Sequence, residues 1–225
     1  AVHNSNIDVL IETIEKTIPT PRRDLSKDAK FYAARSFDVN KPGTEIEKLK
    51  GGVIGGSLTQ GVLREGDEIE IRPGVKQGDK WVSLKSRIVE IVQVNQRTKE
   101  AKPGGLAALQ TELDPALTRG DNLSGSVAGH PGKLPPVHSD ISLKIETFDY
   151  VIGVSGHQKV PQIKQGDSLL ITAAIAKTVG VVTNAKKGDI VVKLKLPVCA
   201  DKGDKVAIAM QVSGRWHLVG YGIIK

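Results

Sequence analysis

The pattern of hydrophobic and polar positions changes near residue 20. Over residues 6–18, aliphatic side chains recur at offsets of 0, 3, 4, 7 and 11, which form one stripe of an amphipathic helix: Ile7, Leu10, Ile11, Ile14 and Ile18. Asn6 is placed to cap this helix, and Asp8 lies in its first turn. A linker that contains Pro19 and Pro21 follows at once. Because the stripe has no evident partner, we expect this helix to be the weakest element.

After the linker, the pattern is that of β-strands. Short aliphatic runs alternate with polar residues, as in Glu68-Ile-Glu-Ile-Arg and Val191-Val-Lys-Leu-Lys-Leu. Glycine-aspartate pairs such as Gly66-Asp67 and Gly166-Asp167 separate these runs, and such pairs are typical of turns. A proline-rich stretch at residues 130–137 divides the β region almost in half. We predict a mainly β protein: residues 1–24 form the helix and linker, and residues 25–133 and 134–225 form two consecutive β-barrels.

Composition places the chain among globular cytosolic proteins. No apolar run reaches the roughly 18 residues that a membrane span needs, and nothing resembles a signal peptide. The single cysteine, Cys199, excludes an internal disulfide and lies in an apolar run, which favours a buried, inert thiol. The net charge of +7 fits a phosphate-rich partner but equally fits a lysine-coated surface.

No catalytic motif is present in this sequence. A phosphate-binding loop requires Gly-x-x-x-x-Gly-Lys-Ser/Thr, and the nearest segment, Gly51-Gly-Val-Ile-Gly-Gly-Ser, lacks the lysine. Asn40-Lys-Pro-Gly begins like the guanine-reading Asn-Lys-x-Asp, but glycine replaces the aspartate. The histidines lack metal-ligand spacing. We therefore predict no catalytic residue, no metal site and no GTP binding or hydrolysis by this chain, and we expect Arg35 and Asp38 to form only a weak exposed pair.

Several stretches carry a family signature, and their order and spacing matter more than any one of them. They are Arg35-Ser-Phe-Asp-Val-Asn-Lys-Pro-Gly, Leu49-Lys-Gly-Gly-Val-Ile-Gly-Gly-Ser, Gly61-Val-Leu-Arg-Glu-Gly-Asp, Ala101-Lys-Pro-Gly-Gly-Leu, Leu113-Asp-Pro, Leu196-Pro-Val-Cys-Ala and Gly214-Arg-Trp-His-Leu-Val-Gly-Tyr-Gly. Over nearly all 225 residues the chain resembles the gamma subunit family of archaeal and eukaryotic translation initiation factor 2. The resemblance implies two barrels of the elongation factor Tu domain II and III type, preceded by the last helix of a GTPase domain. The core of that domain, with its GTP and Mg²⁺, is absent from this chain.

The resemblance also implies a function in translation initiation. Members of this family carry methionyl initiator tRNA to the small ribosomal subunit. Their first barrel docks the alpha subunit, and the GTPase domain contacts the beta subunit. The intact parent protein would be a GTPase. The closing segment departs from the family, because Met210, Gln211 and His217 stand where arginines are expected, and this departure weakens any inferred RNA contact there.

By analogy with elongation factor Tu, the aminoacylated end of the tRNA would lie between two walls of the first barrel. One wall would be Lys50, Gly51, Val53 and Gly55, and the other Gly104, Gly105 and Leu109. Lys50 would meet phosphate, while Val53 and Leu109 would present apolar faces to the adenine. From the residues alone, the glycines are more simply explained by a bulge or a tight barrel corner. A free-standing β-barrel adaptor that binds only protein is the alternative function.

Overall fold

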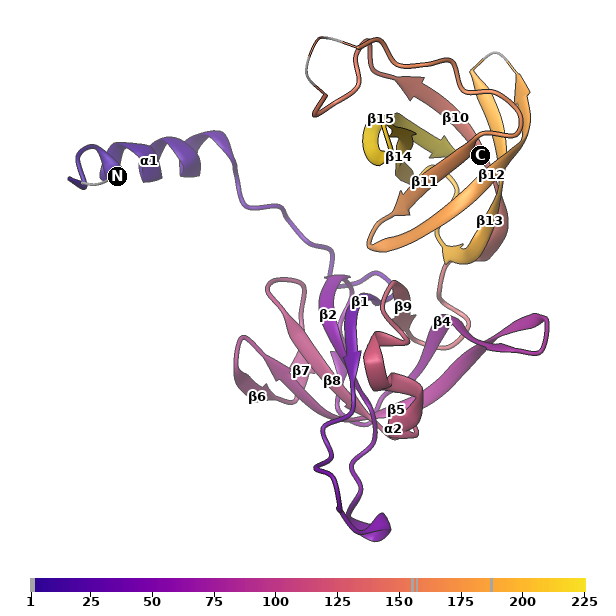
Figure 1. The fold of residues 1–225 in the computed structure, drawn as a ribbon. Helices are drawn as coiled ribbons and strands as arrows, with labels where there is room; N and C mark the ends of the chain where they lie inside the picture. The colour runs from indigo at the N-terminus through magenta and orange to yellow at the C-terminus, as the bar shows by residue number, and fades with distance from the viewer. Residues whose placement is uncertain (1–2, 155, 157, 187) are drawn as a thin grey trace.

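A computed structural model of the chain describes residues 3–154, 156, 158–186 and 188–225. Two β-barrels follow one helix along the chain (Figure 1). This arrangement confirms the predicted fold class.

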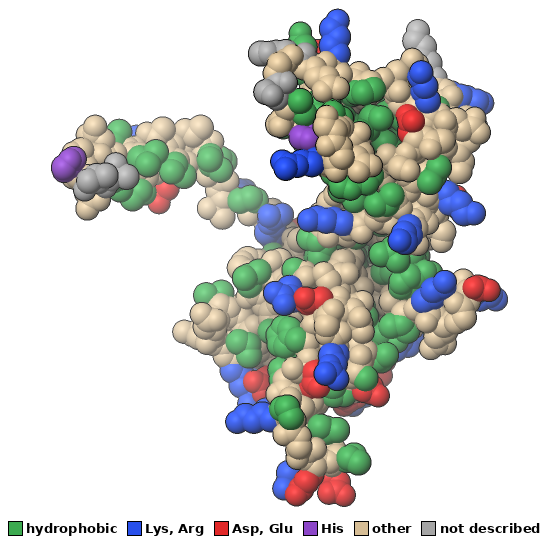
Figure 2. Space-filling view, in the orientation of Figure 1, with side chains coloured by type: hydrophobic (Ala, Val, Ile, Leu, Met, Phe, Trp, Pro, Cys, Tyr) green, Lys and Arg blue, Asp and Glu red, His purple; other side chains and the backbone are tan. Residues whose placement is uncertain are grey.

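Helix α1 (Ile7–Thr17) extends away from both barrels (Figure 1), and none of its residues is buried. Its apolar stripe is open to solvent, with Leu10 and Ile11 each 53% exposed, and hydrophobic side chains are visible along it in Figure 2. Asn6 occupies the N-cap position, but its φ of 60° is left-handed and its side chain makes no capping hydrogen bond. The helix is therefore supported only by local contacts, such as the 2.5 Å ion pair between Glu12 and Lys16.

The first barrel is a closed antiparallel sheet. Its strands are β1 (Lys30–Phe37), β2 (Val53–Gln60), β3 (Leu63–Arg64), β4 (Glu68–Gln77), β5 (Lys80–Gln93), β6 (Gln96–Thr98), β7 (Glu100–Ala101), β8 (Ala107–Thr111) and β9 (Ser126–Gly129). The order is β4-β9-β1-β2-β8-β5-β6, and pairing of β4 with β5 closes the ring. Strands β3 and β7 form a separate pair. Alternate side chains point inward, so Ile54, Ile71, Ile91 and Leu109 are buried in one core.

One short helix and two helical turns interrupt the first barrel. The turn η1 (Ile46–Lys48) lies in the long loop between β1 and β2. Helix α2 (Pro115–Thr118) and the turn η2 (Arg119–Asp121) connect β8 to β9. Asp114 caps α2 by accepting a hydrogen bond of 2.9 Å from the amide of Ala116, as expected for aspartate before a proline at the first helical position.

The second barrel is also closed and antiparallel. Its strands are β10 (Val137–Thr147), β11 (Ser168–Ala173), β12 (Ala176–Lys186), β13 (Asp189–Cys199), β14 (Lys205–Val212) and β15 (Arg215–Ile224). They follow the order β10-β13-β12-β11-β14-β15. Residues including Leu143, Ile171, Val192 and Val219 fill its core. The last strand of the first barrel ends at Gly129 and the second barrel begins at Val137, on either side of the predicted division between residues 133 and 134.

A polar joint holds the linker between the barrels against the first barrel. Arg72 of β4 donates hydrogen bonds to the carbonyls of Leu134 (2.9 Å) and Pro135 (3.1 Å), and it also pairs with Glu70 at 2.8 Å. Glu70 is only 5% exposed and accepts a further bond of 2.9 Å from the amide of Gly132. Each polar group of this cluster that leaves water therefore gains a partner.

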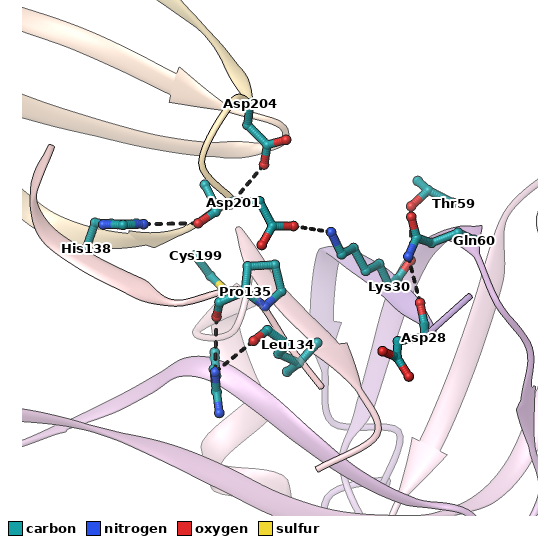
Figure 3. Close-up of polar contacts among 12 residues, drawn as sticks. Asp28, Lys30, Thr59, Gln60, Leu134, Pro135, His138, Cys199, Asp201 and Asp204 are labelled. Atoms are coloured by element: carbon teal, nitrogen blue, oxygen red, sulfur yellow. Dashed lines mark hydrogen bonds and ion pairs between the residues drawn. The ribbon is translucent and has the colours of Figure 1, made fainter. Parts of the chain in front are cut away.

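The second barrel contributes its own contacts to this joint (Figure 3). Lys30 of β1 forms an ion pair with Asp201, which follows β13, and burial of the Lys30 stem is substantial. The thiol of Cys199 is buried and donates to the carbonyl of Pro135 at 3.1 Å. Burial raises the pKa of the Cys199 thiol to about 12. The predicted buried thiol is thus confirmed, and it packs with Val127 and Leu134 between the two barrels.

Candidate nucleic-acid interface on the first barrel

The glycine cluster at residues 51–56 leads into and opens strand β2. A Cβ on Gly51 would lie 1.9 Å from the Thr111 carbonyl oxygen, and one on Gly56 would lie 1.8 Å from that of Tyr32. Both positions therefore need glycine because another backbone comes close, which is the structural explanation of such clusters. This requirement accounts for Gly51 without any ligand.

Gly55 has no such requirement. A Cβ there would meet the Phe37 ring at 3.6 Å and Arg35 at 3.9 Å, both ordinary van der Waals distances. Arg35 pairs with Gly55 across the β1–β2 ladder, and Phe37, two residues further along β1, is 39% exposed. Gly55 thus leaves a shallow open position beside an exposed aromatic ring on the outer face of the barrel. The alternation of β1 places Arg35 and Phe37 on one face, and this period of two is the signal in the sequence that marks the exposed pair.

Lys50 is exposed, and its backbone amide and carbonyl both form hydrogen bonds with the side chain of Asn40. The Lys50 amide donates to Asn40 Oδ1 at 2.8 Å, and Asn40 Nδ2 donates to the Lys50 carbonyl at 2.7 Å. Asp38 in turn accepts from the amide and from Nδ2 of Asn40, each at 2.8 Å. This network closes the base of the loop over residues 38–52 and leaves the Lys50 ammonium in solvent.

The expected pair of Arg35 with Asp38 is wrong. Arg35 Nε instead contacts both carboxylate oxygens of Asp121, at 2.8 and 2.9 Å. Asp121 also accepts from the amide of Ser36 at 2.9 Å. The hydrogen bond from Arg35, followed by that from Ser36, holds the pKa of Asp121 below its ordinary value. Asp38 is already committed to Asn40, so the cross-barrel partner of Arg35 comes from η2, far along the sequence.

The opposite wall differs from the expectation. Leu109 is fully buried in the core, and Val53 is only 5% exposed, so neither side chain presents an apolar face to a ligand. The register explains the burial of Leu109, because it lies opposite Ile54 and both side chains belong to the core of the first barrel. The role expected for the side chains of Leu109 and Val53 is therefore corrected.

The predicted residues also do not surround one pocket. Gly104 and Gly105 precede β8, whose first residue, Ala107, pairs with Gly56. Lys50 and Gly51 lie beyond its other end, where the Thr111 amide donates to Gly52. The five residues from Ala107 to Thr111 separate these sites by about 13 Å along the strand. Gln93 holds the loop of Gly104 by donating to its carbonyl at 2.7 Å.

Other kinds of site find little support here. Among the described residues, no group of three or more histidine, cysteine or acidic side chains is placed to hold a metal ion. Residues 51–57 pass directly into β2 instead of forming a loop before a helix, so they do not fit a nucleotide phosphate. Within the described part of the chain, no helix is long and apolar enough to span a membrane.

Comparison with known proteins agrees with these features. The model of the family "Initiation factor eIF2 gamma, C terminal" matches residues 139–224, and that of "Elongation factor Tu domain 2" matches residues 51–124. The translation initiation factor 2 subunit gamma of Methanothermobacter thermautotrophicus is 52% identical over the whole of this chain. That of Pyrococcus abyssi is 50% identical over the same extent. The chain is thus similar, over its whole extent, to gamma subunits of translation initiation factor 2, and its second barrel matches the model of that family's C-terminal domain.

The match is partial with respect to the relatives. The chain spans 56% of the length of each of these two gamma subunits. A crystal structure of a bacterial selenocysteine-specific elongation factor, EF-Sec, is similar over 99% of this chain and 32% of that protein, with a TM-score of 0.71 at 21% identity. That likeness shows the fold alone: two consecutive β-barrels.

Proposed function

We propose that this chain is the two-barrel part of a translation initiation factor 2 gamma subunit, and that it contributes to binding methionyl initiator tRNA and to docking the alpha subunit for delivery to the small ribosomal subunit. Similarity to gamma subunits over the entire chain, at 52% identity to one of them, is the observation that carries this proposal. A net charge of +7 is compatible with an RNA partner.

In this proposal, the tRNA end meets the outer face of β1 and β2. An exposed base stacks on Phe37 over the open position at Gly55, and Lys50 meets a phosphate. Arg35 acts mainly by orientation, because its guanidinium is held by Asp121. Gly51, Gly104 and Gly105 shape the backbone around this face.

The alpha subunit would dock on the loop over residues 38–52. This loop carries three large apolar side chains in solvent: Val39 at 42%, Ile46 at 85% and Leu49 at 45% exposure. Ile46 begins the turn η1 at the tip of the loop, and Lys48 and Glu45 pair beside it at 2.6 Å. Apolar anchors inside a charged rim are the usual composition of a protein interface.

The remaining parts of the proposal concern the longer protein. The gamma subunits that match are nearly twice as long as this chain, and the GTP, Mg²⁺ and beta subunit would be bound by the part not spanned here. The intact protein would then be a cytosolic GTPase. Purified residues 1–225 should show no GTP hydrolysis above the rate of a buffer blank.

Filter binding of initiator tRNA across a salt series tests the RNA function. Phosphate contacts predict a linear fall of log K with log salt, with a slope of about 0.7 to 0.9 per contact. Gly55→Asp adds a negative charge at an open position and should weaken binding about tenfold without unfolding the barrel. The matched control Ser142→Asp lies on an exposed face of β10 and should bind as the wild type does.

Equal affinity of the wild type and Gly55→Asp would exclude this face as the tRNA site. An affinity no greater than that of an unrelated basic protein would remove RNA binding altogether. The alternative, a β-barrel adaptor that binds only protein, would then be favoured by the exposed loop over residues 38–52. Loss of alpha subunit binding in Ile46→Asp, with tRNA binding intact, would support that loop as the docking surface.

A further inference from the structure

A cleft opens between the two barrels at a place that the proposed function does not use. Its walls come from the β4–β5 hairpin, the segment before β9, the start of β12 and the end of β13, and its cavity volume is about 100 Å³. The residues that matter here are Pro73, Trp81, Asn122, Lys177, Leu196 and Pro197. A space of this size is smaller than the pocket of a whole small molecule and suits a single side chain of a ligand.

One side of the cleft is apolar. Trp81 is half-buried on the hairpin, whose two strands β4 and β5 project beside the joint (Figure 1). Leu196 faces the cleft from the second barrel and is 47% exposed, and the two prolines extend this apolar surface. A large aliphatic side chain left in solvent next to an indole ring is typical of a surface that a partner covers.

The rim of the cleft is basic. Lys177 lines it, and Lys76 pairs with Trp81 across the hairpin and so lies on the same face. Neither of these two lysines forms an ion pair with any described residue, and no Asp or Glu lines the cleft. On the face drawn in Figure 2, Lys and Arg side chains lie along the waist between the barrels.

The cleft is formed in advance by contacts on both sides. A Cβ on Gly125 would lie 3.3 Å from the Cα of Ala176, so the barrels approach closely at its edge. Arg72 and Lys30 fix the joint behind it. A ligand would therefore enter an ordered site and would lose little affinity to ordering of the protein.

We propose that this cleft binds an acidic, extended peptide segment of a partner protein. An apolar or aromatic side chain of the segment lies between Trp81 and Leu196, and its carboxylates face Lys76 and Lys177. The exposed Asn122 side-chain amide is available to the peptide backbone. A peptide fits better than RNA, because half of the wall is apolar and an RNA backbone needs an open row of cations.

A displayed library of random dodecapeptides, panned on the purified chain, tests this proposal. Enriched sequences should combine several Asp or Glu residues with one Trp, Phe or Leu. Synthetic, fluorescein-labelled copies should bind about fivefold more weakly to Lys177→Glu, as expected for an exposed charge pair. Leu196→Ala should also weaken binding, and it checks the apolar wall without any change of charge.

Lys144→Glu is the matched control, because Lys144 is an exposed, unpaired lysine on β10 with the same charge change. Thermal unfolding of each variant should match that of the wild type. Failure to enrich acidic peptides would overturn the proposal, and so would an equal loss of affinity in Lys144→Glu. If oligouridine RNA binds instead, and only its affinity depends on Lys177, the cleft is an RNA site and the peptide proposal falls.

Discussion

Single backbone contacts decide which glycines of the β2 region can change. Gly56→Ala places a methyl group 1.8 Å from the Tyr32 carbonyl, so β1 or β2 must shift, and we expect the variant to lose about 2 to 3 kcal/mol of unfolding free energy. Gly55→Ala, the neighbouring control, meets only ordinary contacts and should change stability by less than about 0.5 kcal/mol. Urea denaturation of both variants measures this difference. Equal losses would show that strand propensity, and not close approach, selects glycine here.

Arg72 is the residue on which the joint depends most. Arg72→Met removes two hydrogen bonds to linker carbonyls and leaves the Glu70 carboxylate, at 5% exposure, with only uncharged partners, the Gly132 amide and the Ser83 side chain. We expect a loss of about 2 to 3 kcal/mol, as for other buried hydrogen bonds to charged groups. Adding Glu70→Gln should recover part of this loss, because the unpaired buried charge is then gone.

The same pair predicts a pH dependence. Burial raises the pKa of Glu70, but hydrogen bonds from Arg72 and the Gly132 amide outweigh it and hold the pKa below the ordinary value of 4.5. A carboxyl group with a lowered pKa in the folded state stabilises the protein above pH 4.5, and this contribution is lost as pH falls through the folded value. The stability difference between the wild type and Glu70→Gln should therefore shrink below pH 4.5, measured by denaturation across a pH series. A constant difference from pH 7 to pH 3 would contradict this assignment.

At the scale of elements, the sequence predicted the type of secondary structure better than it predicted which side chains lie at the candidate site. The period of two and the turn pairs predicted β structure, and the strands at Glu68–Gln77 and Asp189–Cys199 follow that alternation. The Leu109 side chain was wrongly expected on the outer face of the barrel. Its neighbours, Ala108 and Gln110, do not mark which face of the strand is buried, and only the pairing with Ile54 reveals which side faces inward. Partners distant in sequence, such as Arg35 with Asp121, leave no local pattern.

Helix α1 is the element expected to open first. An isolated helix of 11 residues is marginal in water, and α1 has no buried residue and no side-chain cap. Its amides should exchange within seconds in a dilute sample, while those of β4 at Glu68–Ile71 and of β13 at Val191–Leu196 stay protected. Hydrogen exchange followed by mass spectrometry measures both. Protection of α1 equal to that of the strands in a dilute monomer would show that its apolar stripe is covered within this chain.

At the scale of the whole molecule, the joint couples two domains that each have their own core. Arg72 and Glu70 fix the linker, Lys30 reaches across to Asp201, and Cys199 lies between these contacts. Burial opposes the charge on Lys30, but the hydrogen bond and the charge of Asp201 outweigh it and raise its pKa above the ordinary value. The pair therefore persists over the whole neutral range, and separation of the barrels must break it together with the Arg72 contacts.

Cys199 makes this coupling measurable, because it is the only cysteine in the chain. Its thiol is 5% exposed and its pKa is raised to about 12, so in the native protein it should react with a disulfide reagent far more slowly than a free thiol does. Reaction then requires the joint to open. Arg72→Met should raise the labelling rate about tenfold or more, because the linker loses the bonds that close over the thiol.

Arg87→Met is the control for this experiment. Arg87 also lies in the first barrel and pairs with a glutamate, but the pair is exposed and its atoms are 3.7 Å apart. Its loss should leave the Cys199 labelling rate unchanged. If both variants label at the wild-type rate while Arg72→Met is destabilised, the thiol is exposed only by unfolding of a whole barrel. The joint would then be no weaker than the cores that it connects, and the barrels would separate only when one of them unfolds.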